Sequence, residues 1–111
     1  MPKTKVVQRI MRLLILAVVF WQTLNASAYT WTGNPTASGV YPVVGHCAVD
    51  KINGQWVPFG SRITLPDGRT LIVADRFGAS HDNRLDVYLP TENECWSFGR
   101  QMLKCRIEVE E

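Results

Sequence analysis

The sequence has no apolar run long enough to cross a membrane as a helix, and it has few histidines and cysteines. The longest continuous apolar stretch, Leu13 to Trp21, has nine residues, well short of the roughly 20 that span a bilayer. The two histidines and three cysteines show no spacing typical of a zinc site, since His46 and Cys47 are adjacent and cannot bind one ion as a normal pair. We therefore expect no membrane-spanning helix, no metal and no other cofactor.

The N-terminus has the pattern of a secretory signal peptide. Residues 1–12 carry four basic residues and no acidic one, the short apolar run follows, and Ala26-Ser27-Ala28 fits the small-residue cleavage pattern. The sequence predicts that residues 1–28 are a signal peptide and that the mature chain begins at Tyr29. We expect it to be secreted, or to reside in the periplasm or cell wall, without a stable membrane anchor; an uncleaved anchor is the alternative.

Residues 29–111 lack a basic cluster. The leader holds four of the twelve basic residues and none of the ten acidic ones, so the formal charge falls from +2 for the whole chain to −2 for residues 29–111. Without a basic patch there is no electrostatic footprint for nucleic acid, and we expect neutral or mixed-charge partners and a monomer. The remaining 83 residues form one domain near the lower size limit for a self-sufficient core.

The cysteines permit a disulfide if the chain is exported. In the run LKCRIEV, Leu103, Cys105 and Ile107 share one face by period two, so Cys105 is expected in the core. Cys95 lies in a short amphipathic segment. We predict a Cys95–Cys105 bridge that leaves Cys47 as a buried free thiol or in an intermolecular bond; three small core residues are the alternative.

Most of the chain consists of short β-rich runs between turn residues. Asn53-Gly54 and Pro66-Asp67-Gly68 are turn signals, and the capping box from Thr91 to Glu94 predicts one short helix that ends near Gly99. A small sheet protein removes its exposed edges best by closing into a barrel, so a small, closed, mostly β domain is predicted. Its strands are expected at 46–50, 61–65, 69–75, 84–89 and 103–109.

The segment that follows the predicted cleavage site is rich in glycine, threonine, serine and proline, with Tyr29, Trp31 and Tyr41 among them. Aromatic rings beside small polar groups suit sugars, whose C–H faces stack on rings while their hydroxyls need hydrogen bonds. This loop is predicted to form one wall of a sugar groove; packing inside the core is the alternative for each ring.

Three aspartates end or interrupt apolar strand sequence: Asp50, Asp75 and Asp86. Period-two alternation turns Asp86 and Tyr88 away from Leu85, Val87 and Leu89, and it turns Asp75 to the face opposite Ile72 and Ala74. The three acids are therefore predicted to lie where several strands of a small barrel converge.

The order of these motifs resembles the three-aspartate domain family. The resemblance implies a six-stranded double-psi β-barrel, related to that of membrane-bound lytic transglycosylase A and more distantly to rare lipoprotein A and family 45 endoglucanases. The three namesake aspartates match Asp50, Asp75 and Asp86. The motifs are TASG (36–39), HCAVD (46–50), VPFGSRI (57–63), VADRFG (73–78), NRLDVY (83–88) and FGRQ (98–101).

The resemblance implies action on the glycan strands of peptidoglycan. In lytic transglycosylases of this type, the acid that matches Asp86 protonates the glycosidic oxygen between N-acetylmuramic acid and N-acetylglucosamine. As a carboxylate it then takes the proton of the 6-hydroxyl, which leaves a 1,6-anhydro sugar. An inverting glycoside hydrolase follows instead if two acids are far enough apart to admit a water, and a non-catalytic glycan-binding barrel is a further alternative.

The chain departs from the family pattern after the second aspartate, where Arg76-Phe77-Gly78 stands in place of Thr-Gly-Gly. Arg76 is expected to pair with Asp75 or with a substrate carboxylate. Asp50 has a second interpretation as a structural acid that binds backbone amides. The residues predicted to bind substrate are Thr36, Ser38, Arg76, His81, Arg84 and Tyr88.

Overall fold

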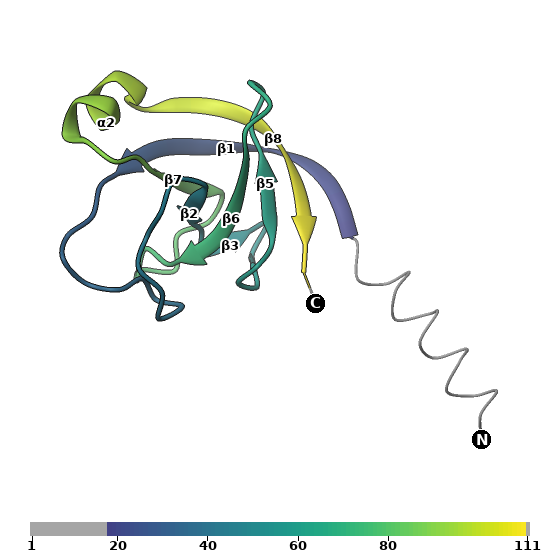
Figure 1. The fold of residues 1–111 in the computed structure, drawn as a ribbon. Helices are drawn as coiled ribbons and strands as arrows, with labels where there is room; N and C mark the ends of the chain where they lie inside the picture. Colours follow the sequence, from purple (N-terminus) through teal and green to yellow (C-terminus); the bar gives the residue numbers. More distant parts are fainter. Residues whose placement is uncertain (1–17, 111) are drawn as a thin grey trace, which may run out of the picture.

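The computed structural model describes residues 18–110, which form a closed barrel of six strands with one short helix beside it (Figure 1). Two strand pairs, β1 with β7 and β2 with β6, are parallel, and the other four are antiparallel. The predicted mostly β, six-stranded barrel is confirmed, and its closed mixed arrangement is compatible with a double-psi barrel. The strands follow the order β1 (Val18–Tyr29), β7 (Arg84–Tyr88), β2 (His46–Ala48), β6 (Thr70–Asp75), β5 (Arg62–Thr64) and β8 (Gln101–Val109).

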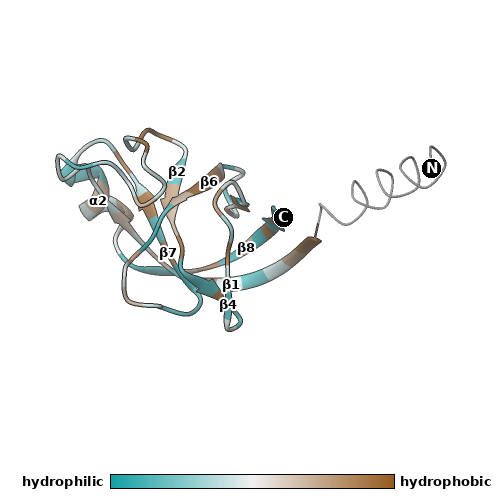
Figure 2. Ribbon diagram, turned by 90° about the horizontal axis from the view of Figure 1, so that it is seen from below, coloured by the Kyte–Doolittle hydropathy of each residue, from teal (hydrophilic) through white to brown (hydrophobic). Residues whose placement is uncertain are grey.

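The core is built by period-two alternation on these strands. Leu24 and Ala26 of β1, Leu85 and Val87 of β7, and Ile107 of β8 are buried inside the barrel. In Figure 2 hydrophobic colour lies on β6 and β7, while much of β8 is hydrophilic. A half-buried strand has this pattern because successive side chains point to opposite faces.

The predicted turns and helix are present. Asn53 and Gly54 both have positive φ, 51° and 80°, and they join the small hairpin of β3 (Lys51–Ile52) and β4 (Gln55–Trp56). Helix α2 (Glu92–Phe98) starts with the expected capping box of Thr91 and Glu94. Within residues 18–110, no helix is both long and apolar enough to cross a membrane.

Strand β1 occupies sequence that the leader prediction assigned to the signal peptide. It pairs with β8 over Val18–Ala26 and with β7 over Asn25–Tyr29, and it closes the barrel between them. The barrel therefore begins before Tyr29, and cleavage after Ala28 would remove nearly all of this strand. Processing at that position stays a prediction, and residues 1–17 lie outside the described residues.

The cysteines differ from the disulfide prediction. Cys47, Cys95 and Cys105 are all free thiols, so the predicted Cys95–Cys105 bridge is not formed. Cys105 is fully buried in the barrel core, as its period-two position predicted. Cys95 instead lines a cavity between α2 and the end of β1. Cys95 lies on the part of α2 that faces the end of β1, whereas Phe98 of the same helix packs against the barrel core.

Candidate functional site

Four residues lie side by side on adjacent strands of the barrel, and we call them the acid row. Ser27 of β1 lies beside Asp86 of β7, Asp86 beside Ala48 of β2, and Ala48 beside Asp75 of β6. The Ser27 hydroxyl donates a hydrogen bond of 2.9 Å to Oδ1 of Asp86. Since neighbouring strands lie about 4.8 Å apart, the two acids flank Ala48 with about 10 Å between their Cα atoms. The structure thus brings Asp75 and Asp86 to one site.

Asp75 reaches this site because of a β-bulge. The register between β2 and β6 shifts between Cys47 and Ala48, so that Val73 pairs with Cys47 but Asp75 pairs with Ala48. Val73 and Ala74 are consequently both buried, at 0% and 5% exposure, and Asp75 lies on the outer face with Ile72. Strict alternation placed the Asp75 side chain on the face opposite that of Ile72. This prediction is wrong, because the bulge adds one residue to β6 and so reverses the direction of the side chains that follow it.

The loop before β2 holds the Asp75 side chain. Oδ1 of Asp75 accepts hydrogen bonds of 2.8 Å from the backbone N–H groups of Ala37 and Arg76. The N–H of Ser38 also donates to the carbonyl of Ala74, at 3.3 Å. The TASG segment therefore fixes the orientation of Asp75 through its backbone.

Asp86 has the environment of a proton donor. Burial raises the pKa of Asp86 above the ordinary carboxyl value, and the negative charge of Asp75 raises it further. The hydrogen bond from Ser27 and the positive charges of Arg84 and Arg100 lower the pKa and limit this rise. A raised pKa keeps part of the carboxyl population protonated closer to neutral pH, as general acid catalysis requires.

Asp50 has a different environment from the other two acids. Its side chain is fully buried, Oδ1 accepts the N–H of Phe77 at 2.9 Å, and Oδ2 accepts the N–H of His81 at 3.0 Å. Both carboxylate oxygens are thus used to hold the loop that follows β6. A side chain without solvent access cannot touch a substrate, so the geometry favours the structural interpretation of Asp50 over a catalytic one.

Tyr29 joins the acid row, although the sequence analysis placed it in a loop. It lies two residues after Ser27 on β1, pairs with Tyr88, and packs edge-on against that ring at 5.8 Å. Its hydroxyl is buried and has no hydrogen-bond partner within residues 18–110. Burial, followed by the charge of Asp75, raises the pKa of Tyr29. A buried phenol normally finds a partner, and the effect of Asp75 on the pKa of Tyr29 places that carboxylate close to this hydroxyl.

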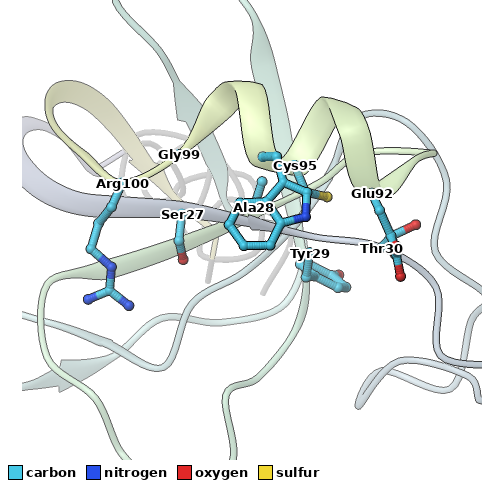
Figure 3. Close-up of a pocket in the computed structure, with 9 residues that line it drawn as sticks. Ser27, Ala28, Tyr29, Thr30, Glu92, Cys95, Gly99 and Arg100 are labelled. Atoms are coloured by element: carbon cyan, nitrogen blue, oxygen red, sulfur yellow. The ribbon is translucent and has the colours of Figure 1, made fainter.

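Two cavities border the acid row. The helix-side cavity, of about 600 Å³, lies between the end of β1 and α2 (Figure 3) and is lined by Ser27, Ala28, Tyr29, Thr30, Glu92, Cys95, Trp96, Gly99 and Arg100. The loop-side cavity, of about 450 Å³, is lined by Trp31, Gly33, Tyr41, Pro42 and Tyr88. Ser27, which is hydrogen-bonded to Asp86, borders the first cavity, and Tyr88, two residues after Asp86 on β7, borders the second; Asp75 and Asp86 themselves line neither cavity.

Exposed aromatic rings line the loop-side cavity, and sugar binding there stays a prediction. Trp31 and Tyr41 are 53% and 62% exposed, and their rings meet edge-to-face at 6.1 Å. Tyr88, one of the predicted substrate-binding residues, forms the barrel side of this cavity. Exposed rings around a cavity beside two carboxylates provide stacking surfaces for a sugar.

The other predicted substrate-binding residues have mixed positions. Arg84 faces Asp86 closely enough to lower its pKa, and its guanidinium stacks over Phe77 at 5.1 Å. The side chains of Thr36 and Ser38 bind each other inside their own loop, with 3.0 Å between the oxygens. Of the six residues predicted to bind substrate, only Arg84 and Tyr88 therefore lie beside the acid row.

Arg76 and His81 point elsewhere. The Arg76 guanidinium stacks on Phe59 at 4.2 Å and donates to the carbonyl of Val49, so it forms no pair with the Asp75 carboxylate. His81 packs edge-on against Phe77 at 5.3 Å. Both residues support the loop after β6 and do not line either cavity.

Sequence reasoning missed three residues of the site, Ser27, Trp96 and Arg100, and it placed Tyr29 in a loop of the predicted groove wall instead of on a strand. For Ser27 and Tyr29 a signal existed, because Leu24 and Ala26 alternate with them at period two, but the leader assignment concealed it. No local pattern marked the other two, which depend on where α2 docks. Residues 18–110 contain no group of three histidine, cysteine, aspartate or glutamate side chains placed to hold a metal ion.

The comparisons with known proteins give a partial match. No family model matches the chain. B-enzyme of Bacillus subtilis is 42% identical over 57 residues, which cover 40% of this chain and 49% of that protein. The chain thus matches about half the length of this relative.

Proposed function

We propose that the protein is an exported peptidoglycan-active enzyme that cleaves the β-1,4 bond between N-acetylmuramic acid and N-acetylglucosamine as a lytic transglycosylase does. The observation that carries the proposal is the position of Asp86. This carboxyl has a raised pKa, is oriented by Ser27, is separated from Asp75 by the single strand β2, and has neighbours, Ser27 and Tyr88, that each line a cavity with exposed aromatic rings. The resemblance to the three-aspartate family and its double-psi barrel supports the same assignment.

In the proposed reaction Asp86 acts twice. Its carboxyl proton passes to the glycosidic oxygen while the bond between that oxygen and C1 of the muramic acid breaks. The resulting carboxylate takes the proton of the C6 hydroxyl as that oxygen attacks C1, which closes the 1,6-anhydro ring and restores the acid. Neither step consumes water or a cofactor.

Asp75 and Tyr29 support the charge changes in this scheme. The negative charge of Asp75 raises the pKa of Asp86 and stabilises positive charge that develops on the sugar ring. The Tyr29 hydroxyl is buried close to Asp75, so it acts on the charge of that carboxylate and not on the substrate directly. Asp50 contributes by holding the loop that follows Asp75, which makes it a positioning residue.

The separation of the two acids favours a second candidate reaction. Because one strand lies between Asp75 and Asp86, their Cα atoms are about 10 Å apart, which is compatible with the wider carboxyl separation that admits a water in inverting glycoside hydrolases. Asp75 would then activate this water while Asp86 protonates the leaving oxygen. The two reactions differ in their products by one water.

Mass spectrometry of muropeptides tests the proposal. Purified sacculi are incubated with the full chain and, as a matched control, with the Asp86→Asn variant. Anhydro products from the full chain alone support transglycosylation, and reducing-end products support the hydrolase. If neither appears while both proteins still sediment with insoluble sacculi, the chain is a glycan-binding barrel and the enzyme proposal fails.

A further inference from the structure

The helix-side cavity has features that the cleavage of a neutral glycan bond does not need. It lies between the end of β1 and α2, and Ser27 on its wall is hydrogen-bonded to Asp86. A ligand in this cavity is therefore next to the acid row. Its volume of about 600 Å³ is within the range of ligand pockets.

Opposite charges border the two ends of this cavity. Figure 3 shows the Arg100 side chain beside Ser27 at one end, and Glu92 beside Thr30 at the other. Among residues 18–110 the ion pairs are Arg69 with Asp67 and Arg106 with Glu108, so neither Arg100 nor Glu92 has an ionic partner there. Both side chains are exposed and available to a ligand.

An apolar surface lies between these charges. Trp96 lines the cavity, is 82% exposed, and belongs to a helix with no buried residue. Ala28 lines the same cavity. An aromatic ring of this exposure provides a platform for aliphatic groups.

We propose that the helix-side cavity binds the peptide that is linked to N-acetylmuramic acid in peptidoglycan. Arg100 pairs with a carboxylate of this peptide, Trp96 packs against its aliphatic side chains, and Glu92 pairs with an ammonium group. This inference rests on the proposed function, and it specifies the substrate as a glycan strand that still carries its peptides.

The charge pattern favours a peptide over a further sugar. An N-acetylated sugar unit without its peptide has no ammonium group for Glu92, whereas the wall peptide carries both carboxylates and, where it contains a diamino acid, an ammonium group. Arg100 also suits this role because a guanidinium binds a carboxylate through two parallel hydrogen bonds. The peptide is attached to the sugar whose bond is cleaved, so its position next to Asp86 fits the geometry.

Isothermal titration calorimetry on the full chain carrying Asp86→Asn tests the proposal without turnover. The probes are the GlcNAc-MurNAc disaccharide with its diamino-acid tetrapeptide, the same disaccharide without the peptide, and the free tetrapeptide. We expect the peptide-bearing disaccharide to bind at least about tenfold more tightly than the peptide-free one, equivalent to about 1.4 kcal/mol. A second substitution, Arg100→Gln, should abolish this difference.

Arg62→Gln is the matched control, because Arg62 is an exposed arginine on β5 and does not line the cavity; it should keep the full difference. Equal affinities for the two disaccharides overturn the peptide site, as does a difference that survives Arg100→Gln. The proposed function fails separately, if the unsubstituted chain releases no muropeptide from sacculi. Binding of the free tetrapeptide that depends on Arg100 would then still support the peptide site.

Discussion

Removal of residues 1–28 is expected to unfold the barrel, because it deletes most of β1. This strand forms nine residue pairs with β8 and five with β7, and only the Tyr29–Tyr88 pair of the five would remain. At a net value of about 1 kcal/mol for each backbone hydrogen bond, the lost pairing is on the order of 10 kcal/mol. A domain of this size has a total unfolding free energy of about 5 to 14 kcal/mol, so residues 29–111 should not hold this fold.

Two purified chains, residues 18–111 and residues 29–111, provide the assay. Circular dichroism with urea titration should show a cooperative transition for the longer chain and none for the shorter. A point substitution isolates the packing contribution: Leu24 is fully buried, so Leu24→Ala in the full chain should lower the unfolding free energy by about 2 to 5 kcal/mol. Thr23→Ala, at the exposed neighbouring position, is the control and should stay within about 0.5 kcal/mol.

An equal urea midpoint for the two chains would refute the reasoning, since β1 would then be dispensable. If the protein is exported, its N-terminal sequence gives a second test. If the cell removes residues 1–28 and the product is folded and active, the barrel must close without β1. If the product retains Leu24 and Ala26, cleavage after Ala28 does not occur.

Three further predictions follow from burial. Asp86→Asn should abolish muropeptide release and leave Tm at pH 7 equal or higher. The pKa of Asp86 is raised in the folded chain, so the unfolding free energy falls as the pH rises from the ordinary carboxyl pKa through the native one. Asparagine does not ionise, so the variant does not have this loss of stability. Asp50→Asn leaves one of two buried amide donors without an acceptor, which should lower the unfolding free energy by about 1 to 3 kcal/mol in urea titration. Cys47 and Cys105 are fully buried, and burial raises the pKa of Cys47 and, to about 11, the pKa of Cys105. Iodoacetamide should therefore label only the partly exposed Cys95 in the native chain and all three cysteines in denaturant without reductant. A Cys95–Cys105 disulfide would instead leave Cys47 as the single labelled residue.

The sequence was sufficient to predict elements whose determinants are local. The capping box at Thr91 and the turn at Asn53-Gly54 depend on neighbouring residues, and both are present. Period two placed Leu85, Val87 and Cys105 in the core, where they are buried. In each case the residue type and its spacing are enough, because the conformation is set within a few positions.

β1 could not be recognised in the same way, because its sequence satisfies two patterns. Leu13 to Trp21 with basic residues before it is typical of a signal peptide, while Leu24 and Ala26 alternate as in a strand. The start of β1 is apolar although Val18 is 49% and Trp21 60% exposed, so its sequence is compatible with a signal peptide as well as with a strand. Only the pairing with β7 and β8, which are distant in sequence, distinguishes them.

The candidate site depends on a feature that local patterns do not contain. By strict alternation Leu71, Val73 and Asp75 would share the core face of β6, and the carboxylate would be buried without compensation. The bulge opposite Ala48 turns Asp75 outward, where Ala37 and Arg76 supply backbone donors. The two acids therefore have different environments. Asp75 accepts hydrogen bonds from backbone amides, whereas Asp86 is partly desolvated beside a single hydroxyl donor. Such a difference in environment between two carboxyls is what assigns separate electrostatic and proton-donor roles, and it arises from how β2 and β6 pair.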